Sequence, residues 1–151
     1  MGTELETILI VEDNQNDVEL TIAALCENNI VNDIAVAEDG VEALDYLYKR
    51  GKFAVNGNSS PAVILLDIKM PRMNGIEVLR HIRNDPKFKF IPVIMVTSSR
   101  EEKDLVESYK LGANSYVVKP VDIIQFIDAI KSLGQYWAVI NQPPSISEKL
   151  D

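Results

Sequence analysis

The sequence of 151 residues contains one cysteine, Cys26, so no disulfide can form within the chain. We therefore expect a protein of a reducing, cytoplasmic compartment, with Cys26 packed as a small apolar residue in a helix. The sequence also lacks an apolar run near the ~20 residues of a membrane-spanning helix, and residues 1–6 contain no apolar signal segment. These absences argue against a disulfide-rich secreted protein and against a membrane protein.

Positive charge and histidine are also scarce. Lys and Arg number 15 against 23 Asp and Glu, which gives a formal net charge of −8. Such an acidic chain is not expected to have nucleic acid or an anionic membrane surface as its main partner. The single histidine, His81, has no Cys or His at metal-ligand spacing, so we expect it to be a structural residue, either at the surface or half-buried.

Short apolar runs alternate with amphipathic segments along most of the chain. Uninterrupted apolar runs are typical of parallel strands that are covered on both faces. The alternation predicts an α/β fold, a doubly wound five-stranded parallel sheet with helices on both faces. The expected strands are residues 7–11, 34–36, 63–66, 92–96 and 115–118. One domain over residues 1–140 is expected, followed by a polar tail at 141–151.

The segment after the fourth expected strand is predicted to be a helix. Ser99 and Glu102 have the spacing of a capping box, which would place the start of this helix at Ser99. Leu105, Val106 and Tyr109 are expected to point inward from it.

Polar residues stand where the expected strands end, namely Glu12-Asp13, Asp67, Thr97 and Lys119. The carboxyl ends of parallel strands share one edge of the sheet, so these side chains should gather in one crevice. Clustered carboxylates repel one another unless a cation joins them, and Mg²⁺ prefers oxygen ligands. Each residue alone has an ordinary explanation as a cap, a turn residue or a solvated side chain. Together they indicate in-line phosphoryl transfer onto Asp67.

The stretches that carry these residues resemble the receiver domains of two-component response regulators. The resemblance covers about residues 6–135, and its matching segments are ILIVEDNQND, VILLDIKMPRMNG, PVIMVTS, LGANSYVVKP and the final helix. It implies that Asp67 accepts phosphate from a sensor histidine kinase. It also implies no further enzyme activity than the chain's own phosphotransfer and autodephosphorylation.

The resemblance assigns further roles to individual residues. Asp13, Asp67 and the backbone carbonyl of Lys69 would bind Mg²⁺, with Glu12 close by. The phosphoryl group would be contacted by Thr97 and Lys119. Thr97 and Tyr116 would form the switch, in which the aromatic ring turns inward on activation, and the Lys119-Pro120 peptide bond is typically cis in such domains.

One residue differs from what many receiver domains have at its position, and several segments resemble a narrower group within the family. Lys69 brings a cation two positions after the acceptor, which bears on phosphoryl lifetime. The loop at 51–61 and the segments DPKFKFIPV, KPVD and GQYW are similar to stand-alone regulators paired with phytochrome-type histidine kinases. No DNA-binding effector is expected after the last helix.

The last helix carries more apolar residues than one buried stripe can hide. A homodimer is therefore predicted, with Phe126, Tyr136 and Trp137 as interface residues. The alternative is that the sheet covers most of these side chains and that the helix end frays.

Two other functions compete with the receiver interpretation. A phosphohydrolase of the haloacid dehalogenase type would also form an aspartyl phosphate, but it needs a second acid two residues later, where Lys69 stands, and a cap domain. An inert scaffold that has lost phosphorylation would not be expected to keep the whole set of strand-end residues.

Overall fold

The computed structural model describes residues 7–27, 33–54, 60–119, 122 and 124–130. Its elements are β1 (Thr7–Val11), α1 (Gln15–Glu27), β2 (Asp33–Ala37), α2 (Gly40–Tyr48), the 3₁₀ turn η1 (Gly51–Phe53), β3 (Val63–Leu66), α3 (Gly75–Asn84), β4 (Val93–Thr97), α4 (Glu102–Lys110) and β5 (Ser115–Val118). Residues 124–130 are helical as well. None of the helices in these ranges is both long and apolar enough to cross a membrane.

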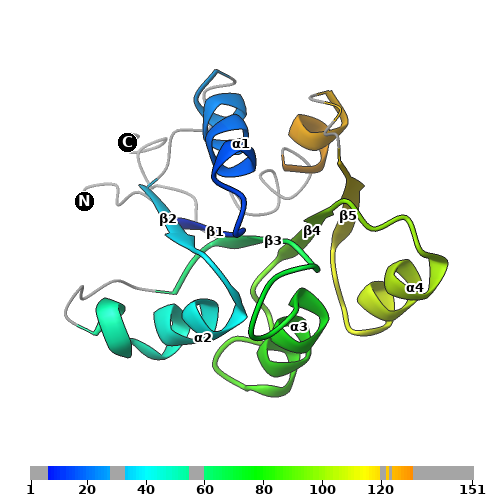
Figure 1. The fold of residues 1–151 in the computed structure, drawn as a ribbon. Coiled ribbons are helices and arrows are strands. Elements are labelled where there is room, and N and C mark those ends of the chain that lie inside the picture. The colour runs from blue at the N-terminus through cyan, green and yellow to red at the C-terminus, as the bar shows by residue number, and fades with distance from the viewer. Residues whose placement is uncertain (1–6, 28–32, 55–59, 120–121, 123, 131–151) are drawn as a thin grey trace, which may run out of the picture.

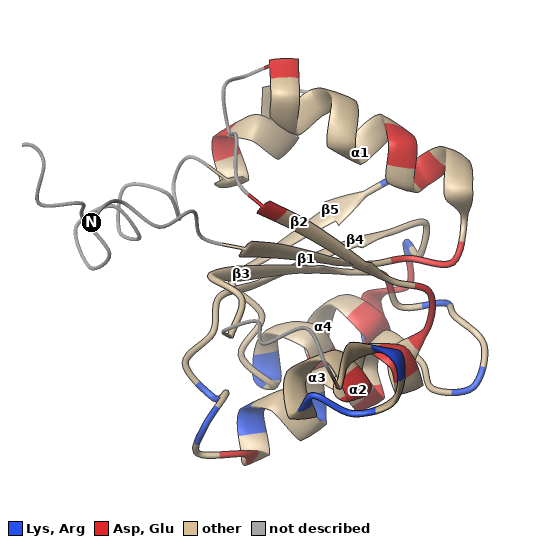
Figure 2. Ribbon diagram, turned by 90° about the vertical axis from the view of Figure 1, so that its left-hand side faces the viewer, with Lys and Arg blue, Asp and Glu red and all other residues tan. Residues whose placement is uncertain are grey.

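The five strands form one parallel sheet in the order β2-β1-β3-β4-β5. Helices α2, α3 and α4 cover one face, and α1 and residues 124–130 cover the other (Figure 1, Figure 2). The predicted doubly wound α/β fold is thus confirmed. In this topology the strand order reverses between β1 and β3, where open α/β sheets have their ligand crevice.

Each strand supplies side chains to both layers because successive residues point to opposite faces. In β1, Ile8 and Ile10 pack in the cluster under α1 and residues 124–130, whereas Leu9 and Val11 pack in the cluster under α2 and α3. Apolar contact on both faces explains why β1, β3 and β4 are continuous apolar runs, and it fixes the strand ends that carry the polar residues.

The expectation for α4 was wrong in two respects. Glu101 is the N-cap of this helix and makes no capping hydrogen bond with its side chain, while the Ser99 hydroxyl donates to Asp104 Oδ2 at 2.6 Å. Leu105, Val106 and Tyr109 are exposed. The fully buried residue of α4 is Ser108, so the face that meets the rest of the domain is narrower and less apolar than the pattern indicated.

The last helix also differs from the expectation. Phe126 is only 1% exposed and packs in the apolar core on the α1 side of the sheet, so it is not an exposed residue of a dimer interface. Ile124, two residues earlier, is 73% exposed and lies on the outer side. Tyr136, Trp137, the tail at 141–151 and the Lys119-Pro120 bond lie outside the described residues.

Cys26 and His81, two residues with expectations based on the sequence alone, both lie at the surface. Cys26 is exposed on α1, so the expectation of a packed cysteine was wrong. His81 is exposed on α3, as expected.

Candidate functional site

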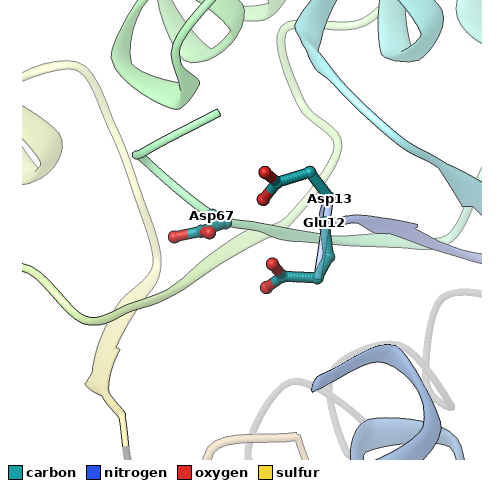
Figure 3. A group of neighbouring side chains, drawn as sticks. All are labelled: Glu12, Asp13 and Asp67. Atoms are coloured by element: carbon teal, nitrogen blue, oxygen red, sulfur yellow. The ribbon is translucent and has the colours of Figure 1, made fainter. Parts of the chain in front are cut away.

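The end of β1 and the end of β3 bring three carboxylates together. One ligand oxygen from each of Glu12, Asp13 and Asp67 lies within 4.8 Å of the others (Figure 3). Glu12 and Asp67 are buried, whereas Asp13 is exposed. The register explains the meeting, because Val11 pairs with Leu66, so that the residues after both strands emerge side by side.

Lys119 enters the same cluster from the end of β5. Its Nζ lies 2.6 Å from Glu12 Oε1, 2.8 Å from Asp17 Oδ2 and 3.5 Å from Asp67 Oδ2. Asp17, in the first turn of α1, was not predicted to belong to the site. Its only signal in the sequence was an acidic residue at a helix start, which is common without any function.

Burial shapes the charges of the cluster. It raises the pKa of Glu12 to about 7, although the hydrogen bonds from Lys119 and from the backbone N–H of Asn14 act to lower it. Burial would lower the pKa of Lys119, but the hydrogen bonds to Asp17 and Glu12 outweigh it and raise the pKa above its usual range. Lys119 is therefore a permanent cation among carboxylates.

Asp67 retains an unused acceptor. Its Oδ1 atom is buried and makes no hydrogen bond with any described part of the chain. A buried carboxylate oxygen without a partner is costly and calls for a ligand. A hard divalent cation takes oxygen ligands, and one or two carboxylates with room for water suit it. The buried Asp67 and the exposed Asp13 meet this requirement.

The loop between β3 and α3 lies against the site and is held in three ways. A Cβ atom on Gly75 would lie 2.1 Å from the Asp67 carbonyl oxygen, so only glycine permits this approach. Asn74 and Glu77 form a capping box at the start of α3. Arg72, whose φ is 69°, donates two hydrogen bonds to Asp39, at 2.8 and 3.1 Å. Lys69 lies in this loop with an exposed side chain.

Thr97 and Tyr116 are linked through Ser99. The buried Thr97 Oγ1 accepts the backbone N–H of Ser99 at 3.2 Å, and the Tyr116 hydroxyl donates to the Ser99 carbonyl at 3.2 Å. Burial raises the pKa of Tyr116, which keeps the phenol protonated as a donor. The two residues predicted as a switch therefore share one neighbour, although they do not bond to each other in the hydrogen bonds described here.

Residues 8–131 match the family model of the response regulator receiver domain. The response regulator Rcp1 of Synechocystis sp. is 31% identical over 132 residues, which cover 87% of this chain and 88% of Rcp1. The solved bacteriophytochrome response regulator RtBRR is 51% identical, with a TM-score of 0.80, over 96% of this chain and 87% of that one.

A structure of Rcp1 bears on the acidic cluster. The Mn²⁺-bound form of Rcp1 is similar to this chain with a TM-score of 0.71 and 31% identity, over 91% of this chain and 95% of that one. In this chain, Glu12, Asp13 and Asp67 form a group of carboxylates that could hold a metal ion. The comparisons give no support to a phosphohydrolase of the haloacid dehalogenase type. The fold, the acidic cluster with its lysine and the match over most of the sequence together show that the chain belongs to the response regulator receiver domain family.

Proposed function

We propose that Asp67 accepts a phosphoryl group from a sensor histidine kinase and that its phosphorylation switches partner binding. The observation that carries this proposal is the buried Oδ1 of Asp67, which has no hydrogen-bond partner among the described residues, in a carboxylate whose Oδ2 lies 3.5 Å from the Lys119 ammonium. In the transfer, one carboxylate oxygen of Asp67 forms a bond to phosphorus as the bond from phosphorus to the kinase imidazole nitrogen breaks. The bonding electron pair stays on that nitrogen.

Residues of this chain orient the reacting groups and stabilise the phosphoryl group, both in this transfer and in the later hydrolysis of the aspartyl phosphate. Lys119 offsets the charge of the phosphoryl oxygens, and the Thr97 hydroxyl donates to one of them. Asp13 and Asp67 would hold Mg²⁺ together with the backbone carbonyl of Lys69, with Glu12 alongside. The chemistry that Mg²⁺ supplies when bound is positive charge against the phosphoryl oxygens.

The switch is proposed to run through Ser99. When the Thr97 hydroxyl turns to the phosphoryl group, the Ser99 N–H loses its acceptor, and the Tyr116 hydroxyl can leave the Ser99 carbonyl and turn inward. Thr97→Ala should therefore still be phosphorylated, but its partner affinity should change little on phosphorylation. Partner affinity that responds as strongly in this variant as in the wild type would contradict the switch.

We also propose that the kinase is of the phytochrome type and that the chain acts in the cytoplasm. The similarity to Rcp1 and RtBRR supports this pathway. Purified, autophosphorylated kinases of the phytochrome type and of an unrelated type would each be mixed with the wild type, with Asp67→Asn and with Asp33→Asn. Asp33 is an exposed aspartate at the opposite edge of the sheet and serves as the matched control.

Faster transfer from the phytochrome-type kinase to the wild type and to Asp33→Asn is expected, with none to Asp67→Asn. Equal transfer from both kinases would contradict the pathway without contradicting the acceptor.

A homodimer through the last helix is proposed as well. It is supported by the excess of apolar residues in the sequence of this helix, of which Ile124 is exposed in the structure.

A further inference from the structure

Among the described residues, three carboxylates contact the Lys119 ammonium. Glu12 and Asp67 directly follow β1 and β3, whereas Asp17 belongs to α1. Its carboxylate lies 2.8 Å from Nζ, against 2.6 Å for Glu12 and 3.5 Å for Asp67. The Lys119 side chain is only 15% exposed, and the Asp17 side chain is 33% exposed. Lys119 is therefore held on the α1 side of the site, nearer to Glu12 and Asp17 than to Asp67.

The chain fixes Asp17 in this place through Asn14. The Asp17 backbone N–H donates to Asn14 Oδ1 at 3.0 Å, and the Asn14 backbone N–H donates to Glu12 Oε2 at 3.0 Å. One short turn thus links both of the carboxylates that hold the ammonium. An acid at the third position of a helix often bonds back to the backbone at the helix start. Here the backbone N–H of Asn14 is taken by Glu12, and the Asp17 side chain reaches Lys119 instead.

We propose that Asp17 is a positioning residue that holds the Lys119 ammonium away from Asp67 and so leaves the Asp67 carboxylate open to a divalent cation. This inference rests on the proposed function, because it concerns the same acceptor. Without Asp17, the ammonium is shared by Glu12 and Asp67 alone. It then shifts toward Asp67 and competes with the divalent cation for the same carboxylate.

Mn²⁺ titration followed by the electron paramagnetic resonance of the free ion tests this directly. The variants are Asp17→Asn and, as matched control, Glu19→Gln, which removes the same charge from an exposed residue of the same helix. Each is made in the wild type and in a Lys119→Met background. Asparagine keeps the shape of aspartate and is well tolerated near a helix start.

We expect Asp17→Asn to weaken Mn²⁺ binding about tenfold when Lys119 is present, as contacting charged side chains couple by such amounts. Glu19→Gln should change it by no more than about twofold, because exposed charges are screened. Lys119→Met alone should tighten binding. In the Lys119→Met background, the weakening of Mn²⁺ binding by Asp17→Asn should be at least about threefold smaller. A residue that acts through Lys119 has nothing left to position there.

Two results would overturn the inference. One is an Asp17→Asn effect equal to that of Glu19→Gln, and the other is an equal Asp17→Asn effect with and without Lys119. Both would leave the proposed function intact. A wild type that binds no Mn²⁺ at all would contradict the proposed metal site and this inference together.

Discussion

The two oxygens of Asp67 have different surroundings. Oδ2 lies 3.5 Å from the Lys119 ammonium, whereas Oδ1 is buried without a hydrogen bond to any described residue. Retaining such an atom costs stability, because a desolvated acceptor has lost its water. Residues that break the rules of a stable core in this way are expected at functional sites. The free Oδ1 is therefore the oxygen of Asp67 that is open to a ligand.

Asp39 and Arg72 give a pH-dependent prediction for the loop that lies against the site. Burial alone would raise the pKa of Asp39, but the hydrogen bonds from Arg72 and from the backbone N–H of Glu42 outweigh it and hold the pKa below the ordinary 3.8. Asp39→Asn keeps a good N-cap for α2 and removes the ion pair. At neutral pH it should lower the free energy of unfolding by up to about 1 kcal/mol.

The sign follows from linkage. A depressed carboxyl pKa adds stability above the unfolded value, and this stability is lost as pH falls through the folded pKa. Urea unfolding of the wild type and of Asp39→Asn should therefore converge below pH 3.8. A gap that stays constant from neutral to acid pH would mean that the charge of Asp39 contributes nothing.

At the scale of elements, α4 contains an atom that packing leaves unsatisfied. The Ser108 hydroxyl is buried and has no hydrogen-bond partner among the described residues. Alanine removes this group and favours the helix, so Ser108→Ala should raise the free energy of unfolding by about 1 kcal/mol. Urea unfolding midpoints measure this, with Ser98→Ala at an exposed position as control. A destabilised Ser108→Ala would show that the hydroxyl has a partner.

The sequence pattern predicted correctly those elements whose position in the fold depends on buried apolar residues. The runs of β1, β3 and β4 are buried on both faces, so their length and spacing led directly to the sheet. The pattern failed for α4, because its apolar residues are exposed and a serine occupies the buried position. It also misplaced Phe126, since both sides of the last helix carry apolar residues, and periodicity alone cannot say which side meets the sheet.

The site was predictable as far as it lies at strand ends. Glu12, Asp67 and Lys119 do meet, because strand register sets their positions. Asp17 was missed because it lies on α1 and not at a strand end, and an acidic residue at a helix start is common without any function. Arg83 is a similar case, a half-buried side chain that donates to the carbonyls of Gly112 and Ile91 and so ties α3 to two later segments. Such contacts depend on tertiary packing and leave no local pattern.

At the scale of the whole molecule, the proposed homodimer needs a revised set of contributors. Phe126 is committed to the core, so the aromatic contribution would come from Tyr136 and Trp137, together with the exposed Ile124. A Tyr136→Ala/Trp137→Ala double variant should shift sedimentation from dimer to monomer at micromolar concentration, because interfaces depend on a few aromatic residues. Phe90→Ala, at a position 84% exposed in the segment before β4, is the matched control and should remain dimeric. A wild type that sediments as a monomer with and without phosphate on Asp67 would end this proposal.

The proposed function depends most on the identity of the phosphoryl acceptor. Wild type and Asp67→Asn would be incubated with Mg²⁺ and acetyl phosphate, and the modified residue located by mass spectrometry of peptides. We expect one phosphoryl group on Asp67 in the wild type and none in Asp67→Asn. A phosphoryl group that persists in Asp67→Asn, or one that lies on His81, would contradict this assignment of the acceptor.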